Sequence, residues 1–195
     1  MKYDILVNKD NAINEDFYKM VMSSLNEVPF ERDNDVIFTS FGIQDKKIFL
    51  EKETMKNWFL LKTYINNKQN IQFDICSGFL TIAQQQNKYN DYLNRNGLEL
   101  TKKSVLEAGF SEHNTGLAID CDYFYNNDWA GICPNEFGNE NEITYWIHSI
   151  LHEFGFILRF PKDKEIITKM KYEPWHIRYV GKDLANYLYN NSLTL

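Results

Sequence analysis

Residues 172–181, with the sequence YEPWHIRYVG, restrict the possible fold more than any other stretch of the chain. Pro174 disfavours helical geometry at Glu173, so we expect a bend at EPWH. After the bend, polar and apolar side chains alternate from His176 to Val180, which predicts a strand. Glu173 and His176 lie three residues apart around this bend. We therefore predict that their side chains point into one place.

A second stretch, residues 111–120 (SEHNTGLAID), supplies possible partners. His113 precedes a glycine turn, and Asp120 ends an apolar run that is typical of a strand. Imidazole and carboxylate are good zinc ligands, and three protein ligands with one open position are typical of a catalytic site. We predict that His113, Asp120 and His176 hold zinc and that Glu173 activates a water molecule. For any single histidine, a hydrogen-bonded place in the core is the common alternative.

His148 and His152 form a rival metal site. They are spaced i, i+4 on a predicted helix over residues 143–154, and this spacing can chelate a metal. Both are expected to project away from the apolar stripe of that helix, toward solvent. The pair also lacks the adjacent glutamate of the HExxH motif, so we expect two exposed surface histidines.

Composition limits the class of protein. With 195 residues, of which 44% are hydrophobic, the chain is expected to form one domain over residues 1–195, with a core over about 5–189. A net charge of -6 argues against a general nucleic-acid binder. No apolar stretch reaches membrane-spanning length, and the first residues, MKYDILVNKDNAINEDF, show no basic region followed by an apolar run and a cleavage site, so we expect a cytoplasmic protein with no membrane span. The cysteines form no CxxC pair, which speaks against a disulfide framework or a cysteine zinc site: Cys76, Cys121 and Cys133.

Hydrophobic periodicity predicts an α+β domain in which a central antiparallel sheet carries the zinc ligands and helices pack around it. Helices are predicted over residues 15–25, 52–65, 81–95, 143–154 and 183–189. Strands are predicted over residues 3–7, 36–38, 71–76, 117–124 and 176–180, with a loop at 126–139. In the helix over residues 52–65, the apolar face is expected to consist of Met55, Phe59, Leu60 and Tyr64, widened by Trp58 and Leu61.

The paired stretches resemble the motifs SxHxxGxAxD and ExWHxRYVG of the zinc D-Ala-D-Ala carboxypeptidases and dipeptidases of the VanY and VanXY type. ILVNKDNAI, SGF at residues 77–79 and GFILRFP at residues 155–161 also resemble family segments, so the likeness covers about residues 5–181. The resemblance implies the same zinc ligands and the same base, Glu173. It also implies a zinc-dependent D,D-peptidase that hydrolyses the D-Ala-D-Ala dipeptide, the C-terminal D-Ala of peptidoglycan precursors, or both.

Substrate-binding residues are expected around the zinc. Ser111 is implied by the resemblance, Trp175 is large enough to wall a pocket, and the amide-rich helix over residues 81–95 either lines the site or forms a solvated face. Arg159 and Arg178 are candidates to meet a substrate carboxylate, or else structural ion-pair residues. The predicted substrate-binding set is Ser111, Gln85, Trp175, Arg159, Ser77 and Leu80.

The chain departs from the family pattern at Leu80. The family usually has SGYR, with an arginine that contacts substrate, where this chain has SGFL. Loss of that cation predicts poor turnover on the usual substrate. Two alternatives therefore stay open, a non-catalytic zinc-scaffold protein that binds peptidoglycan peptides and a related L,D-endopeptidase. Retention of Glu173 favours an enzyme.

Overall fold

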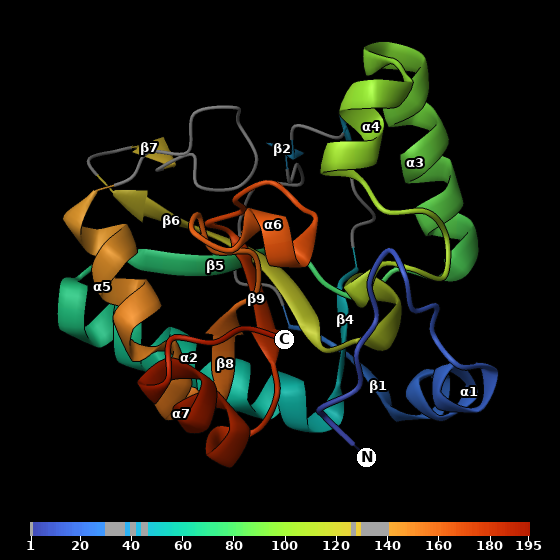
Figure 1. Ribbon diagram of the computed structural model, residues 1–195. Helices are drawn as coiled ribbons and strands as arrows, with labels where there is room; N and C mark the ends of the chain where they lie inside the picture. The colour runs from blue at the N-terminus through green and yellow to red at the C-terminus, as the bar shows by residue number, and fades with distance from the viewer. Residues whose placement is uncertain (1, 30–37, 40–41, 44–46, 126–127, 130–140) are drawn as a thin grey trace.

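The computed structural model describes residues 2–29, 38–39, 42–43, 47–125, 128–129 and 141–195. A central sheet runs through the middle of the molecule in the strand order β5-β6-β9-β8 (Figure 1). These strands are β5 (Gln72–Ser77), β6 (Ala118–Tyr125), β9 (His176–Tyr179) and β8 (Phe156–Leu158), and the short β7 (Asp128–Trp129) pairs with the end of β6. Every pair is antiparallel, which confirms the predicted α+β class.

The two faces of the sheet differ in polarity because side chains alternate along each strand. On β6, Ile119, Cys121 and Tyr123 belong to the main hydrophobic core. Asp120 and Asp122, at the intervening positions, are directed to the opposite face. On β9, Ile177 and Tyr179 likewise join the core, and His176 and Arg178 alternate with them. The strand pattern therefore sends polar side chains from both strands to one side.

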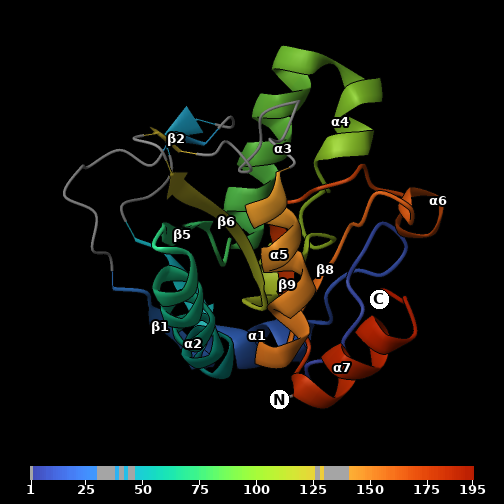
Figure 2. The same cartoon turned by 90° about the vertical axis from the view of Figure 1, so that its left-hand side faces the viewer.

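The apolar face is covered by α2 (Lys52–Gln69) and α5 (Glu142–Ile150), with α7 (Lys182–Asn190) beside them (Figure 2). Trp58, Leu61 and Ile65 of α2 pack into the core, as do Ile147 and Ile150 of α5. The chain continues from α5 as a 3-10 helix, η2 (Leu151–Phe154). A smaller cluster joins α7 to the sheet edge and consists of Ile157, Val180, Ala185 and Leu188.

Figure 1 shows α3 (Ile82–Asn96) and α4 (Leu98–Ser104) standing together, on the opposite side of the molecule from α2, α5 and α7. A capping box starts α3: the Thr81 hydroxyl accepts from the backbone N–H of Gln84, whose side chain accepts from the backbone N–H of Thr81. The 3-10 helix η1 (Glu112–Thr115) and the short α6 (Glu165–Thr168) complete the structure around this side.

The N-terminal part adds α1 (Glu15–Ser24) and two small antiparallel pairs. β1 (Leu25–Glu27) pairs with β4 (Phe49–Glu51), and β2 (Phe38–Thr39) pairs with β3 (Gly42–Ile43). β4 runs directly into α2, and the Glu51 side chain caps that helix by accepting from the backbone N–H groups of Glu53 and Thr54.

Most predicted elements are present, but the strand predicted at residues 3–7 is wrong. Residues 2–7 form no strand, and the backbone carbonyls of Tyr3 and Ile5 instead accept hydrogen bonds from Arg178 Nη2 at 3.1 and 2.9 Å. Of the strand predicted at residues 36–38, Phe38 lies in β2 and the other two residues lie outside the described ones. The loop predicted at residues 126–139 also lies outside them, except for β7.

Two helices differ from the prediction. α4 has no predicted counterpart, because LELTKKS has no clear apolar stripe. α2 continues four residues beyond its predicted end, and its buried face is centred on Trp58, Leu61 and Ile65, whose spacing of three and four residues follows one side of a helix. Leu60, predicted on that face, is 49% exposed.

Two further expectations concern thiols and membranes. Cys76 and Cys121 are buried free thiols, and Cys133 lies outside the described residues. Among the described helices, none combines the length and apolar character that a membrane crossing needs.

The neighbouring leucines of α2 give a test of this packing. Leu61→Ala should lower the free energy of unfolding by about 2 to 5 kcal/mol, because Leu61 is fully buried and truncation leaves a cavity. Leu60→Ala, the matched control, should change it by less than about 1 kcal/mol. Urea unfolding of the two variants followed by circular dichroism measures both values, and equal losses would contradict the observed orientation of α2.

Candidate metal centre and active site

Three elements bring His113, Asp120 and His176 together, and we call these residues the ligand cluster. His113 lies on η1, whose backbone turns at Gly116 with a φ of +67° before β6 begins. Asp120 lies on β6 and His176 on β9, and the two residues are directly paired across the strands. Because paired residues point to the same face, the sheet itself sets two of the three side chains side by side.

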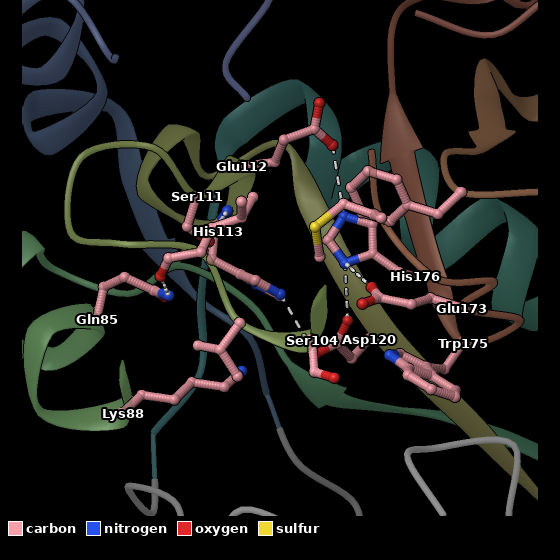
Figure 3. Close-up of a pocket in the computed structure, with 14 residues that line it drawn as sticks. Gln85, Lys88, Ser104, Ser111, Glu112, His113, Asp120, Glu173, Trp175 and His176 are labelled. Atoms are coloured by element: carbon pink, nitrogen blue, oxygen red, sulfur yellow. Dashed lines mark hydrogen bonds and ion pairs between the residues drawn. The ribbon is translucent and has the colours of Figure 1, made fainter. Parts of the chain in front are cut away.

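The side chains of the ligand cluster converge on one point (Figure 3). His113 Nε2 lies 3.3 Å from Asp120 Oδ2, and His176 Nδ1 lies 3.1 Å from Asp120 Oδ1. The two imidazole rings meet edge to face, with centroids 5.1 Å apart. One ligand atom from each residue lies within 4.8 Å of the others, and all three residues are buried. Within the described part of the chain, this is the one group of three such side chains that could hold a metal ion.

Hydrogen bonds on the far side of each ring assign the nitrogen that is left for a metal. His113 Nδ1–H donates to the carbonyl oxygen of Gly78 at 2.7 Å, which leaves the Nε2 lone pair. His176 Nε2 lies 3.4 Å from Glu112 Oε2, and with the ring proton held there the Nδ1 lone pair would be available to a bound metal. These are the two nitrogens that face Asp120. Two imidazole nitrogens and a carboxylate, each oriented from behind, fit a divalent metal such as zinc.

Position 78, whose carbonyl oxygen orients His113, requires a glycine. A Cβ atom built at Gly78 would lie 2.7 Å from both Ile48 Cγ2 and the Phe49 carbonyl oxygen. The end of β5 approaches β4 too closely for any side chain there. The glycine that directly follows β5 is therefore required by close packing beside the ligand cluster.

Glu112 supports the ligand cluster from behind, a role that sequence reasoning missed. Its Oε1 accepts from Arg159 Nε at 2.9 Å and from Arg178 Nη1 at 2.8 Å, and its Oε2 faces His176. Burial disfavours the charged carboxylate, but the two guanidinium groups and His176 together hold the pKa of Glu112 well below its usual range. The one available signal was the position of Glu112 next to a predicted ligand, in a chain where Arg159 and Arg178 were already candidates for structural ion pairs.

The ligand cluster is strongly charged. Burial opposes ionisation of Asp120, yet the adjacent His113 and His176 hold its pKa well below its usual range. Burial likewise favours neutral His176, but hydrogen bonds to Asp120 and Glu112 raise its pKa to about 9. The carboxylates of Asp120 and Glu112 thus favour positive charge on or between the two imidazole rings.

Glu173 lies beside the ligand cluster, as predicted from the bend at EPWH. Its Oε2 is 3.8 Å from His176 Nδ1, and its backbone N–H donates to the Phe160 carbonyl oxygen at 3.1 Å. Burial raises the pKa of Glu173 to about 7, and the negative charges of Asp120 and Glu112 add to the effect, although His176 and Lys88 oppose it. A carboxyl group with a pKa near neutrality is suited to take up and release protons.

A cleft opens over the ligand cluster and Glu173. Its polar lining residues outside those four are Gln85, Lys88, Ser104, Ser111 and Glu112, and its other walls are Val105, Leu106, Phe160, Met170 and Trp175. Of the predicted substrate-binding residues, Ser111, Gln85 and Trp175 line this cleft. Lys88 and Ser104, which sequence reasoning did not single out, line it as well; Lys88 follows Gln85 by three residues on α3.

The other three predicted substrate-binding residues, Arg159, Ser77 and Leu80, do not line the cleft. Arg159 lies behind the ligand cluster on Glu112, and Arg178 is held in the same way. Ser77 is buried at the end of β5. Leu80 contributes backbone contacts: its N–H donates to the His113 carbonyl oxygen at 3.1 Å, and its own carbonyl accepts from Asn114 Nδ2 at 2.7 Å. A role in substrate binding for any of these residues stays a prediction.

The rival histidines are not exposed, which corrects the sequence prediction. His148 is half-buried, and its Nε2 lies 2.8 Å from the Pro174 carbonyl oxygen. His152 is also half-buried and stacks on Tyr189, with ring centroids 3.7 Å apart. The helical projection failed because it takes no account of the EPWH bend and α7, which cover these two side chains.

The comparison with protein families agrees with this geometry. The model of the VanY family, D-alanyl-D-alanine carboxypeptidase, matches residues 47–182. The chain belongs to the VanY family. It is 36% identical over 163 residues to YodJ of Bacillus subtilis (strain 168), named as a carboxypeptidase, covering 83% of this chain and 57% of YodJ. It is also 36% identical over 137 residues to the bifunctional D-Ala-D-Ala dipeptidase and carboxypeptidase VanXYC of Enterococcus gallinarum, covering 70% of each chain. The chain thus spans little more than half of YodJ.

Solved structures share the fold over nearly the whole chain. The LdcB L,D-carboxypeptidase matches with a TM-score of 0.75 and 31% identity, over 97% of this chain and 81% of that one. A point variant of the D,D-pentapeptidase VanY, from a VanB-type vancomycin resistance cassette and in complex with Zn(II), matches with a TM-score of 0.71 and 25% identity, over 97% and 94%.

Glu112→Gln tests the support behind the ligand cluster. The amide cannot neutralise Arg159 and Arg178, so the metal-free protein should lose about 3 to 5 kcal/mol of unfolding free energy. Zinc affinity should fall about 10- to 100-fold, because the partner of His176 is weakened. The exposed Glu107→Gln is the matched control and should change neither value. Denaturant unfolding and zinc competition titration measure the two effects, and unchanged stability would show that the buried ion pairs do not hold this region.

Proposed function

We propose that the protein is a zinc-dependent D,D-peptidase that hydrolyses D-Ala-D-Ala or removes the C-terminal D-Ala of peptidoglycan precursor peptides. One observation carries the proposal: the ligand cluster and the buried carboxylate of Glu173 lie side by side in a single cleft. A metal-binding site without catalysis has no need of a further buried carboxyl group beside its three ligands. Membership of the VanY family supports the same reaction.

Zinc is the metal that this proposal assigns. The donor set of two imidazole nitrogens and one carboxylate suits zinc and leaves a fourth position open. Zinc bound there supplies a Lewis acid that polarises a peptide carbonyl and makes water more acidic. The similar VanY variant structure is a Zn(II) complex, which supports this choice.

Glu173 is the proposed general base and acid. Its Oε2 faces the ligand cluster, where it can accept the proton of the attacking water and then deliver it to the leaving amine. The hydrogen bond from its backbone N–H to the Phe160 carbonyl oxygen fixes the chain at Glu173 beside the ligand cluster before substrate binds. The apolar walls of the cleft, including Leu106, Phe160 and Met170, suit the methyl side chains of alanine residues.

An L,D-carboxypeptidase is the second candidate, because the LdcB structure is similar along 97% of this chain. The hydrolytic chemistry would be the same, and the two candidates differ in the configuration of the residue before the scissile bond. A panel of peptides that differ only in this configuration separates them. Faster cleavage of the L,D peptide would replace the D,D assignment.

Metal binding can be tested with matched histidine variants. His113→Ala should bind less than about 0.1 zinc per chain, since the site is left with two ligands. His152→Ala should bind about one zinc per chain, like the unmodified protein, because His152 lies outside the ligand cluster. Equilibrium dialysis with elemental analysis measures the stoichiometry. Zinc retained by His113→Ala and lost by His152→Ala would place the metal at the rival site.

The role of Glu173 can be separated from metal binding. Glu173→Gln should keep its zinc but lower the hydrolysis of D-Ala-D-Ala about 100- to 10,000-fold, because the amide keeps the shape of the side chain but accepts no proton. Steady-state kinetics beside a zinc measurement on the same sample checks both statements. Full activity in this variant would remove Glu173 from the mechanism.

A further inference from the structure

The proposed substrate ends in a carboxylate, and the cleft must accommodate that negative charge. The proposed zinc offsets the two acidic groups of Asp120 and Glu173, so the entering carboxylate still needs a positively charged partner of its own. The arginines that sequence analysis considered for this task, Arg159 and Arg178, are both bound to Glu112 behind the ligand cluster. Leu80, at the position where the family motif has its arginine, carries no charge and does not line the cleft.

We propose that Lys88 binds the terminal carboxylate of the peptide substrate. Lys88 lies on α3 and is half-buried. Among the described residues that line the cleft, it is the only lysine or arginine. This assignment rests on the proposed peptidase function and deepens it, since it names the group that selects peptides with a free C-terminus.

The surroundings of Lys88 suit this role. Figure 3 shows Lys88 and Gln85 entering the cleft from one side, while Glu173 and Trp175 lie on the other. The positive charge of Lys88 acts on Glu173 across the cleft, where it partly opposes the rise in the pKa of that carboxyl group. The lysine stem is long and flexible, so its ammonium group can move to an incoming carboxylate.

Gln85, on the same side of the cleft, offers a hydrogen-bond acceptor to the backbone of a peptide substrate. Its side chain is buried, and its Nε2 donates to the Leu106 carbonyl oxygen at 2.6 Å. Its Oε1 is buried and has no hydrogen-bond partner among the described residues. That oxygen can accept from a substrate N–H one helical turn from Lys88. The two side chains together offer an acceptor for the peptide backbone and a cation for its end.

A competing role for Lys88 is to adjust the charge of Glu173 without touching substrate. The two roles differ in their dependence on the substrate. A lysine that binds the terminal carboxylate matters only for a peptide that has one, whereas a lysine that acts through Glu173 matters equally for a peptide whose C-terminus is an amide.

The experiment compares an N-acetylated peptide ending in D-Ala-D-Ala with the same peptide carrying a C-terminal carboxamide. For the free acid, Lys88→Met should raise KM about 10- to 100-fold with a smaller change in kcat, because a charge-assisted contact is lost on binding. For the carboxamide, Lys88→Met and the unmodified protein should have the same kinetics. Lys88→Arg should keep most of the activity on the acid. Arg95→Met, which removes an exposed cation from the last turn of α3, is the matched control and should have no effect.

A binding measurement gives a second readout. Calorimetric titration of the zinc-loaded Glu173→Gln protein with the acid peptide, with and without Lys88→Met, should show the same loss of affinity, about 10- to 100-fold, a range typical of one charged hydrogen bond. The unfolding midpoint of Lys88→Met should equal that of the unmodified protein, since the lysine is half-buried on a helix surface.

The outcomes separate this inference from the proposed function. Equal losses on acid and carboxamide, or no loss on either, with hydrolysis by the unmodified protein intact, would overturn the assignment of Lys88 and leave the peptidase function standing. Binding of the acid that depends on Lys88 but is followed by no hydrolysis would support Lys88 and contradict the peptidase function. Neither binding nor hydrolysis of the acid by the unmodified protein would overturn both.

Discussion

The buried carboxylate of Glu112 connects almost every part of the structure that the site depends on. It lies on η1, accepts from Arg159 just after β8 and from Arg178 on β9, and faces His176. Arg178 in turn donates to the backbone of the N-terminal segment, at Tyr3 and Ile5. Two buried guanidinium groups without this carboxylate would carry a desolvation cost of several kcal/mol each. The position of His176 is therefore set by an ion-pair network as well as by the strand that carries it.

This network also explains how the site can accept a dication. The three carboxylates of Glu112, Asp120 and Glu173 outnumber the two buried arginines, and both arginines are directed to Glu112. The negative charge of Asp120 and Glu173 is left on the cleft side, where His113 Nε2 and His176 Nδ1 face Asp120. Glu112 thus stabilises the positive charges of Arg159 and Arg178 behind the ligand cluster. Asp120 and Glu173 favour a further cation on the cleft side.

Sequence reasoning was most successful where local chemistry decides the structure. Pro174 forces the bend before β9, and alternation along β6 and β9 puts Asp120 and His176 on the same face, so the ligand cluster and Glu173 came together as predicted. It failed where contacts between distant segments decide. Glu112 and Arg178 are 66 residues apart, and no periodicity reports that they meet, or that Arg178 also occupies the carbonyls of the N-terminal segment. His148 and His152 were misplaced for the same reason, since a helical projection contains no information about the elements that cover the helix.

The arrangement of charge across the cleft sets the orientation in which the proposed peptide substrate binds. Asp120 lies on the sheet and Glu173 in the EPWH bend, while Lys88 and the amide oxygen of Gln85, which has no hydrogen-bond partner among the described residues, belong to α3. A peptide whose terminal carboxylate is held at Lys88 presents its last peptide bond to the ligand cluster and Glu173, because only one residue separates that bond from the carboxylate. An internal bond of a longer chain would place neutral backbone against Lys88, so the charge-assisted contact that favours a free C-terminus would not form. In this proposal, selection of the C-terminal residue follows from the position of the Lys88 charge on α3, and the proposed metal and Glu173 need have no part in that choice.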